Sequence, residues 1–135
     1  LLRMHYLVAE SFDFEQYEGF IYDASMYPDI RELYVISDIL ITDYSSVFFD
    51  YANLRRPIIF YTYDIESYRD TLRGFYFDLE REAPGTLVYN ESELMEEIER
   101  VLRNPQLHKN YESFYEKFCS FEDGKASERV VKSIF

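Results

Sequence analysis

The stretch Ile39-Leu40-Ile41-Thr42-Asp43-Tyr44-Ser45-Ser46 decides the fold of this chain. Its apolar first half predicts a buried strand over residues 38–43, and the serine pair opens a helix expected over residues 45–54. A helix that begins where a strand ends brings backbone N–H groups, hydroxyls and a positive helix end to one point, which suits a phosphate or diphosphate. Open α/β sheets bind ligands at such points, outside the carboxyl ends of their strands. The alternative is that Ser45 only caps the helix.

Strand and helix patterns alternate along the rest of the chain. The apolar runs show little period-2 alternation, as expected for strands covered on both faces of a parallel sheet. Repeated strand–helix units predict an α/β fold, a Rossmann-like parallel sheet flanked by helices. We expect a single domain over residues 1–135, with residues 107–135 as a C-terminal helical region. Further strands are expected at residues 1–8, 20–23, 57–63 and 86–89, and further helices from Pro28, at 65–73, from Ser92 to Asn104, at 111–118 and at 127–135.

The helix that Ser92 is expected to cap shows the clearest amphipathic pattern. Asn104-Pro105 follows it and marks its end. Its apolar residues share one face at helical spacing, while its charged residues are expected to face water. The apolar face consists of Leu94, Met95, Ile98, Val101 and Leu102, and the charged face of Glu93, Glu96, Glu97 and Arg100.

Composition limits the class of partner. The chain has 135 residues, of which 47% are hydrophobic and 19% aromatic, so it can bury a core. The net charge of −12 argues against broad nucleic-acid binding, which needs a basic face, and against binding of this segment alone to anionic lipid. The single cysteine, Cys119, excludes an internal disulfide. No signal peptide is visible, no apolar run approaches the roughly 18 residues of a spanning helix, and a start at Leu1 indicates a fragment.

Other polar residues could join the serine pair at the same edge of the sheet. Arg3 and His5 alternate along the first expected strand, so they point to the same side of it. Arginine offers phosphate a forked set of donors, and histidine donates a hydrogen bond or carries a proton near neutral pH. Alternatively, His5 satisfies a backbone carbonyl. Asp43 and Asp50 are further candidates. The carboxylate of Asp50 could accept a hydrogen bond from a hydroxyl of a sugar or polyol; alternatively, it is a solvated acid on the surface of the helix.

The remaining patterns indicate which chemistries to leave aside. Arg73 and Asp78 flank a glycine turn near the expected carboxyl edge of the sheet, in an aromatic cluster that indicates packing. Two histidines and one cysteine lie too far apart in the sequence for a zinc-site spacing, so no metal is expected. The four scattered glycines match neither the dinucleotide-binding nor the P-loop fingerprint, and Ser45 lacks the glycine setting of a hydrolase elbow.

Three segments closely resemble the CDP-glycerol glycerophosphotransferases, a family that includes the teichoic acid primases and polymerases of Gram-positive bacteria. The resemblance runs from Arg3 to about Asn104. It implies a GT-B fold, in which two Rossmann-like domains face each other, and this chain would be most of the C-terminal, donor-binding domain. The segments are Tyr27-Pro28-Asp29-Ile30, Ile36-Ser37-Asp38-Ile39-Leu40-Ile41-Thr42-Asp43-Tyr44-Ser45-Ser46-Val47-Phe48-Phe49-Asp50 and Arg73-Gly74-Phe75-Tyr76-Phe77-Asp78.

The resemblance also implies roles for individual residues. By resemblance, the diphosphate of CDP-glycerol lies over the start of the helix expected at 45–54, and His5 is the catalytic candidate. A second histidine of the family, in a Trp-His-Gly-Thr-type motif, would activate the acceptor, but no such motif occurs here. It would lie upstream, so the isolated chain is not expected to catalyse. The substrate-binding residues implied are Arg3, His5, Ser45, Ser46 and Asp50, with Asp43 and Arg73 as further candidates.

The activity implied for the parent protein is transfer of glycerol phosphate from CDP-glycerol to a poly(glycerol phosphate) or lipid-linked acceptor in teichoic acid synthesis. No cofactor is expected, and dependence on magnesium is left open. The alternatives are a transferase that uses CDP-ribitol or another polyol phosphate, and a non-catalytic nucleotide-binding module.

The expected partners follow from the same resemblance. CDP-glycerol would bind to this chain and the acceptor would bind through the missing N-terminal domain, without nucleic acid. The parent would be cytoplasmic, with membrane contact at the inner face of the cell membrane through its other parts. Because the last helix of GT-B enzymes commonly crosses to the partner domain, we also expect an uncovered apolar stripe, formed by Tyr111, Phe114, Tyr115 and Phe118.

Overall fold

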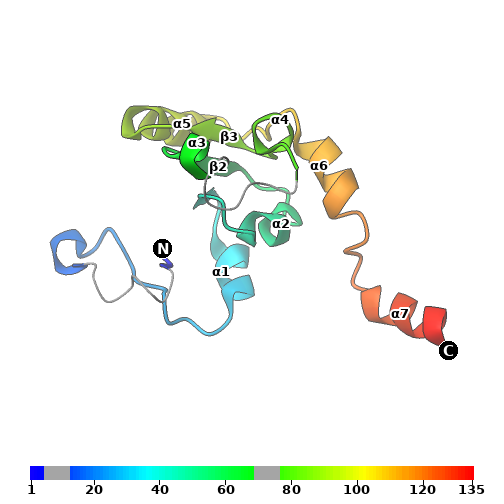
Figure 1. The fold of residues 1–135 in the computed structure, drawn as a ribbon. Helices are drawn as coiled ribbons and strands as arrows, with labels where there is room; N and C mark the ends of the chain where they lie inside the picture. The colour runs from blue at the N-terminus through cyan, green and yellow to red at the C-terminus, as the bar shows by residue number, and fades with distance from the viewer. Residues whose placement is uncertain (5–12, 69–76) are drawn as a thin grey trace. The chain divides into compact units, whose positions relative to one another are not determined.

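The computed structural model describes residues 1–4, 13–68 and 77–135, which fall into two compact units, Leu1–Ile36 and Ser37–Phe135 (Figure 1). The first unit contains the 3-10 helix η2 (Glu15–Tyr17) and the helix α1 (Ile30–Ile36). Where strands are predicted at 1–8 and 20–23, the described residues form one parallel bridge, between Leu2 and Asp23. Two backbone hydrogen bonds support it, because Leu2 donates to the carbonyl of Tyr22 and accepts from the N–H of Ala24.

The second unit contains a parallel sheet with the order β1-β2-β3. Its strands are β1 (Leu40–Thr42), β2 (Ile58–Tyr61) and β3 (Thr86–Val88). Leu40 pairs with Ile58, and Ile59 pairs with Thr86, so the central strand lies in register between its two neighbours. Residues 58–60 are buried because β2 has a neighbouring strand on each side and helices on both faces. The predicted parallel α/β sheet is confirmed, with each of these strands shorter than its apolar run.

Helices cover both faces of this sheet. Helix α5 (Glu91–Arg103) packs against β2 and β3, where Val101 joins Ile59 and Val88 in one buried cluster. Helix α2 (Val47–Ala52) lies against the other face, since the ring of Phe48 meets that of Phe60 edge to face at 5.1 Å. Neighbouring residues of a strand point to opposite faces, so Ile59 and Phe60 connect the two layers through a single strand.

Four further helices lie in the described part of the second unit. Helices α3 (Ile65–Ser67) and α4 (Leu79–Glu82) follow β2, and α6 (Tyr111–Phe118) and α7 (Ala126–Ile134) follow α5. Among the described residues, α7 has no buried side chain. The interpretation of residues 1–135 as one domain with a C-terminal helical region stays a prediction.

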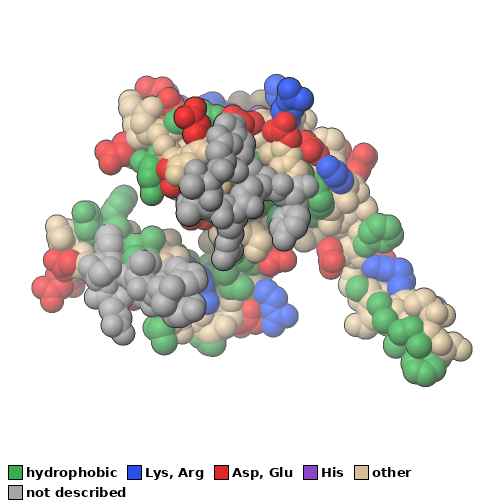
Figure 2. All heavy atoms as spheres, viewed as in Figure 1, with side chains coloured by type: hydrophobic (Ala, Val, Ile, Leu, Met, Phe, Trp, Pro, Cys, Tyr) green, Lys and Arg blue, Asp and Glu red, His purple; other side chains and the backbone are tan. Residues whose placement is uncertain are grey.

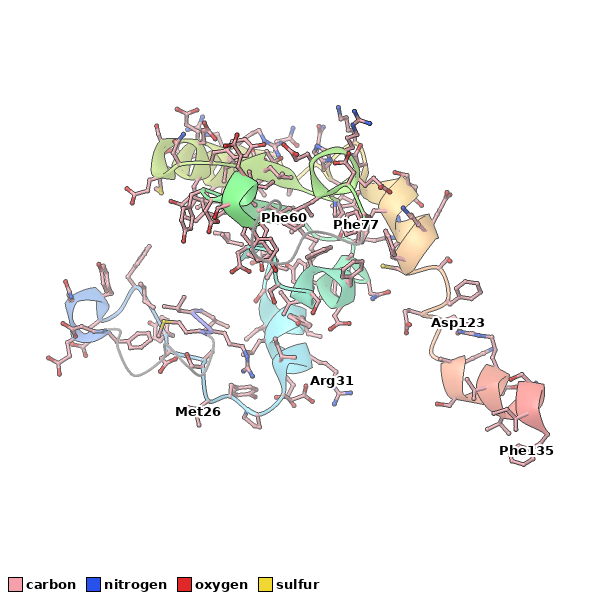
Figure 3. All side chains as sticks on the ribbon, in the orientation of Figure 1. Met26, Arg31, Phe60, Phe77, Asp123 and Phe135 are labelled. Carbon is pink, nitrogen blue, oxygen red and sulfur yellow. The ribbon has the colours of Figure 1, made fainter. Side chains whose placement is uncertain are left out.

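Helix α6 is packed against α2, so the predicted uncovered aromatic stripe is wrong at two of its residues, Tyr111 and Phe114. Tyr111 is 1% exposed and Phe114 is 2% exposed. The ring of Phe114 lies 5.3 Å from Phe49 and 6.1 Å from Phe77, and Phe77 lies between α2 and α6 in Figure 3. These two residues are covered from within the chain because α2 offers them a matching aromatic face, whereas Phe118 is 37% exposed.

The hydroxyl of Tyr111 also fastens α6 to the end of α2. It donates to the carbonyl of Ala52 at 3.3 Å and to that of Arg56 at 3.0 Å. On the surface beside it, the guanidinium of Arg55 pairs with Glu112 at 2.6 Å and lies 4.0 Å from the ring centre of Tyr115. The last carbonyl groups of a helix need partners from elsewhere, and here α6 supplies one.

The cap and the exposed face of α5 differ from their predictions. Asn90, not Ser92, occupies the N-cap, and its side chain accepts a hydrogen bond from the N–H of Glu93 at 3.0 Å. The side chain of Glu93 bonds back to the N–H of Tyr89, which completes a reciprocal capping arrangement.

The buried stripe of α5 is narrower than the sequence pattern. Val101 is buried, but Met95 is 58% exposed and Leu102 is 68% exposed. Glu97 does not face water freely, because its largely covered carboxylate pairs with Arg100 at 2.7 Å. That pairing, together with a hydrogen bond from Thr86, lowers the pKa of Glu97 although burial opposes the shift. The end of the helix at Asn104 is confirmed.

Candidate ligand site at the carboxyl edge of the sheet

The turn after β1 exposes three of the predicted site residues. Asp43, Ser45 and Ser46 are exposed, and a carboxylate oxygen of Asp43 accepts a hydrogen bond from the N–H of Ser45 at 2.9 Å. Helix α2 begins at Val47, with Ser46 at the N-cap position and no capping hydrogen bond from its side chain. The helix predicted at 45–54 therefore begins two residues later, and the alternative that Ser45 caps it is wrong. The Asp43 carboxylate has taken the N–H of Ser45 and closed a local turn ahead of the helix.

Tyr44 is the one inward-facing residue of this turn. Its side chain is half-buried, and its hydroxyl donates to the carboxylate of Asp64 at 2.8 Å. Its ring stacks on Tyr68, with ring centres 4.0 Å apart and planes 20° from parallel. Burial raises the pKa of Tyr44 well above its ordinary value, and the hydrogen bond to Asp64 raises it further. The turn is thereby joined to the segment that follows β2.

Sequence patterns did not single out Tyr44 or Asp64. A signal for this pairing exists, because Tyr44 follows the end of β1 and Asp64 follows the end of β2. Those strands are parallel neighbours, so the residues just beyond their ends meet at the same edge of the sheet.

Asp50 lies on the same short helix as the serine pair. It is exposed and belongs to the first turn of α2, where a negative side chain is favourable to the helix dipole. The structure therefore brings Asp43, Ser45, Ser46 and Asp50 together on one exposed strand–turn–helix segment.

Arg3 lies in the other unit. Its Nη1 donates to the carbonyl of Ala24 at 3.1 Å and to that of Tyr27 at 2.6 Å. These bonds hold the guanidinium against the Leu1–Ile36 backbone. His5 and Arg73, the other two predicted cationic site residues, lie outside the described residues.

Asp78, which was predicted to flank a glycine turn, serves as a helix cap. Its carboxylate accepts a hydrogen bond from the N–H of Arg81 at 3.2 Å, at the start of α4. The carboxyl ends of the other two strands are followed by tyrosines, with Tyr63 exposed after β2 and Tyr89 exposed after β3.

The net charge of the chain is −12. Figure 2 shows carboxylates spread over the visible face rather than gathered in one place. Within residues 1–4, 13–68 and 77–135, no three His, Cys, Asp or Glu side chains are grouped so that they could hold a metal ion. In the part of the chain that the structure describes, no helix has the length and apolar character needed to cross a bilayer.

Comparison with known protein families shows to which family this chain belongs. The model of the CDP-Glycerol:Poly(glycerophosphate) glycerophosphotransferase family matches residues 1–135. The chain belongs to this family. The glycerophosphotransferase resemblance inferred from three segments between Arg3 and about Asn104 is confirmed, and the match covers the full chain.

Three curated relatives illustrate the range of this glycerophosphotransferase family. A teichoic acid poly(glycerol phosphate) polymerase of Bacillus subtilis (strain 168) is 58% identical over 136 residues, which cover 100% of this chain and 18% of the relative. A teichoic acid glycerol-phosphate transferase of Staphylococcus aureus is 48% identical, over 100% of this chain and 34% of the relative. A teichoic acid poly(ribitol-phosphate) polymerase of Bacillus spizizenii is 42% identical, with 88% and 19% covered. The chain thus spans between a fifth and a third of the length of these glycerophosphotransferase relatives.

Solved structures of the glycerophosphotransferase family share the fold. The wall teichoic acid polymerase TagF matches with a TM-score of 0.82 at 43% identity, over 98% of this chain and 32% of TagF. A TagF variant soaked with CDPG matches with a TM-score of 0.81, over 98% of this chain and 33% of that protein. These matches confirm the predicted Rossmann-like part of a GT-B fold.

Proposed function

We propose that the protein containing this chain transfers glycerol phosphate from CDP-glycerol to a poly(glycerol phosphate) acceptor, and that this chain supplies the donor site. The observation that carries the proposal is the glycerophosphotransferase family match over all of residues 1–135. Relatives named as glycerol phosphate polymerases and transferases support the reaction, and the CDPG soak of TagF supports the donor.

The proposed donor site is the exposed turn between β1 and α2. The diphosphate would accept hydrogen bonds from the hydroxyls of Ser45 and Ser46 and from the backbone N–H groups that start α2. Asp50, one turn further on, would accept a hydroxyl of the glycerol. Asp43 holds the turn through the N–H of Ser45, at 2.9 Å, and is the further candidate.

From the family resemblance we also propose that Arg3 and His5 bind the donor, with Arg73 as an additional candidate cation. In the proposed reaction, the acceptor hydroxyl attacks the β-phosphorus, and the bond from this phosphorus to the bridging oxygen breaks so that CMP leaves. Cations and N–H donors would stabilise the charge on the leaving phosphate, because positioning and charge stabilisation supply most of phosphoryl-transfer catalysis. The base for the acceptor would come from outside this chain, and no resident cofactor is proposed.

Replacing the serine pair tests the location of the donor site. We expect Ser45→Ala with Ser46→Ala, in the intact protein, to weaken CDP-glycerol binding about 100-fold or more, since each hydrogen bond to a charged group contributes roughly 1.5–3 kcal/mol. The matched control is Ser113→Ala with Ser133→Ala, which removes two hydroxyls that donate to the carbonyl groups of Asn110 and Val130. Isothermal titration with CDP-glycerol measures both pairs. Equal affinities of the two variants would show that the donor does not bind at this turn.

The proposed role of His5 predicts a particular pH dependence. A phosphate beside the imidazole favours its charged form, so the pKa of His5 would be higher in the complex than in the free protein. The binding gain is then fully present below the free-state pKa, ordinarily near 6.5, and is lost as the pH rises through the bound-state pKa. NMR titration of the His5 ring with and without CDP-glycerol measures this difference. An unchanged His5 pKa would leave this residue without a role at the phosphates.

A ribitol phosphate donor is the second candidate, because the Bacillus spizizenii ribitol-phosphate polymerase matches 88% of the chain. The poly(glycerol phosphate) polymerase of Bacillus subtilis is more similar, at 58% against 42% identity, so glycerol is preferred. Competition between CDP-glycerol and CDP-ribitol for the intact protein decides between them. We further propose that the reaction takes place in the cytoplasm, at the inner face of the cell membrane, on a lipid-linked acceptor held by other parts of the protein.

A further inference from the structure

Tyr44 and Asp64 form a contact across the carboxyl edge of the sheet that the donor site alone does not explain. The phenolic hydroxyl donates to the Asp64 carboxylate at 2.8 Å, and the tyrosine ring stacks on Tyr68 at 4.0 Å. Tyr44 stands between Asp43 and Ser45, both of which are exposed, while its own side chain is half-buried. The turn therefore points its polar groups outward and is held from below by one tyrosine.

The side chain of Asp64 bonds to Tyr44 and does not cap its own helix. It occupies the N-cap position of α3, where an aspartate commonly accepts from a backbone N–H of the first turn. In this structure its side chain makes no capping hydrogen bond and reaches Tyr44 instead. An aspartate placed at a helix start but bonded to a residue 20 positions earlier indicates that the distant contact determines its conformation.

Within its own segment the turn is held by the Asp43 carboxylate, which accepts from the N–H of Ser45, and Tyr44 adds an anchor from the segment after β2. Helix α2 has 6 residues, and the side chain of Ser46 does not cap it. Short helices are marginal without tertiary contacts, so the position of their first N–H groups depends on what they are packed against. The rear of α2 is fixed by Phe48 and by the Tyr111 hydroxyl bond to Ala52, whereas Tyr44 fixes the front.

We propose that Tyr44 and Asp64 form a clasp that holds the turn at residues 43–46 in the conformation that binds the diphosphate of the donor. Tyr44 is then a positioning residue, and it need not touch the substrate. This inference rests on the proposed function, because it assumes that the donor binds at this turn. Loss of the clasp lowers the fraction of molecules with a binding-competent turn, and the apparent affinity falls by the same factor.

Tyr44→Phe tests the clasp in the intact protein, because it keeps the stacked ring and removes only the hydroxyl. We expect the KM for CDP-glycerol to rise roughly 3- to 10-fold, the effect of losing one hydrogen bond, with the KM for the acceptor unchanged. Asp64→Ala should give the same increase, and Asp64→Asn, whose amide oxygen still accepts the hydroxyl, should remain near the original value. The combination of Tyr44→Phe with Asp64→Ala should be no worse than either change alone, since both remove the same bond.

Tyr111→Phe is the matched control, because it also removes a tyrosine hydroxyl that bonds to other parts of the fold, but at the rear of α2. If Tyr44→Phe changes the donor KM no more than Tyr111→Phe, while the paired Ser45 and Ser46 change still weakens binding, the clasp is refuted and the donor site stands. If the serine pair change also leaves the donor KM unaltered, the donor does not bind at this turn and both proposals fail together.

Discussion

Gly85→Ala is expected to be strongly destabilising because the backbone of β2 occupies the space that a side chain would need. Gly85 is buried just before β3, and a Cβ atom built on it would lie 2.1 Å from the carbonyl oxygen of Ile58 and 3.0 Å from the ring of Phe60. Real Cβ contacts of this kind are not shorter than about 3 Å, so β2 and β3 would have to separate by roughly 1 Å in a close-packed core. We expect a loss of about 3 kcal/mol or more, at the upper end of the cost of overpacking.

Urea unfolding of the 135-residue chain, followed by circular dichroism, measures this loss. Gly124→Ala is the control, because nothing lies within 4 Å of its built Cβ but its φ is +76°. Its expected cost is only the left-handed strain, about 1–2 kcal/mol. Hydrogen exchange at the N–H of Thr62, which donates to the carbonyl of Val88 at 2.8 Å, reports the β2–β3 contact directly. If Gly85→Ala destabilises the chain no more than Gly124→Ala, the steric argument is wrong.

Three further predictions concern packing, capping and pH. Phe114→Ala should lower the free energy of unfolding by about 3–5 kcal/mol, because it leaves a cavity between α2 and α6. Phe121→Ala, at a residue that is 73% exposed, should change it by no more than about 0.5 kcal/mol, and urea midpoints compare the two variants. Asn90→Ala should cost about 1 kcal/mol, and Ser92→Ala much less, in the same assay; equal costs would contradict the assignment of the cap. Burial and then the charge of Lys109 lower the pKa of His108 below 6.5, so the folded protein favours the neutral imidazole. The stability that is present above pH 6.5 should therefore be lost as the pH falls through the folded-state pKa. His108→Gln should remove this fall in stability at low pH. If the urea midpoints of the variant and of the original protein change with pH in the same way, the prediction is wrong.

The sheet was predictable from sequence because its signal is local. Each strand is an apolar run bounded by polar or turn residues, and the runs at residues 38–43, 57–63 and 86–89 all contain a strand. The bounds of α6 were also predicted as they occur, from the aromatic residues at helical spacing over residues 111–118.

Helix caps were less predictable because two polar residues often compete for one position. Ser92 has the right chemistry, but Asn90 is followed three residues later by Glu93, and this pair caps α5 reciprocally. The same competition explains Ser45, whose N–H is taken by Asp43 before the helix begins.

Contacts between distant segments were the hardest to foresee. The burial of Phe114 depends on the aromatic face of α2, and the role of Tyr44 depends on a residue 20 positions away. In both cases the sequence shows which groups need a partner, and the order of the parallel strands determines which partner they find. Of the predicted site residues, Asp43, Ser45, Ser46 and Asp50 share one segment, as the strand–helix pattern indicated.

The hydrogen bonds of Tyr111 have a consequence for the order in which the chain acquires its structure during synthesis. The carbonyl groups of Ala52, at the end of α2, and of Arg56, between α2 and β2, have a partner that is made more than 50 residues later. Until the ribosome has released residue 111, the segment that carries the serine pair lacks both this bond and the covering ring of Phe114. The β1–α2 segment therefore remains incomplete while most of the sheet is already available, and a nascent chain stopped before α6 should expose phenylalanines to chaperones and to its neighbours.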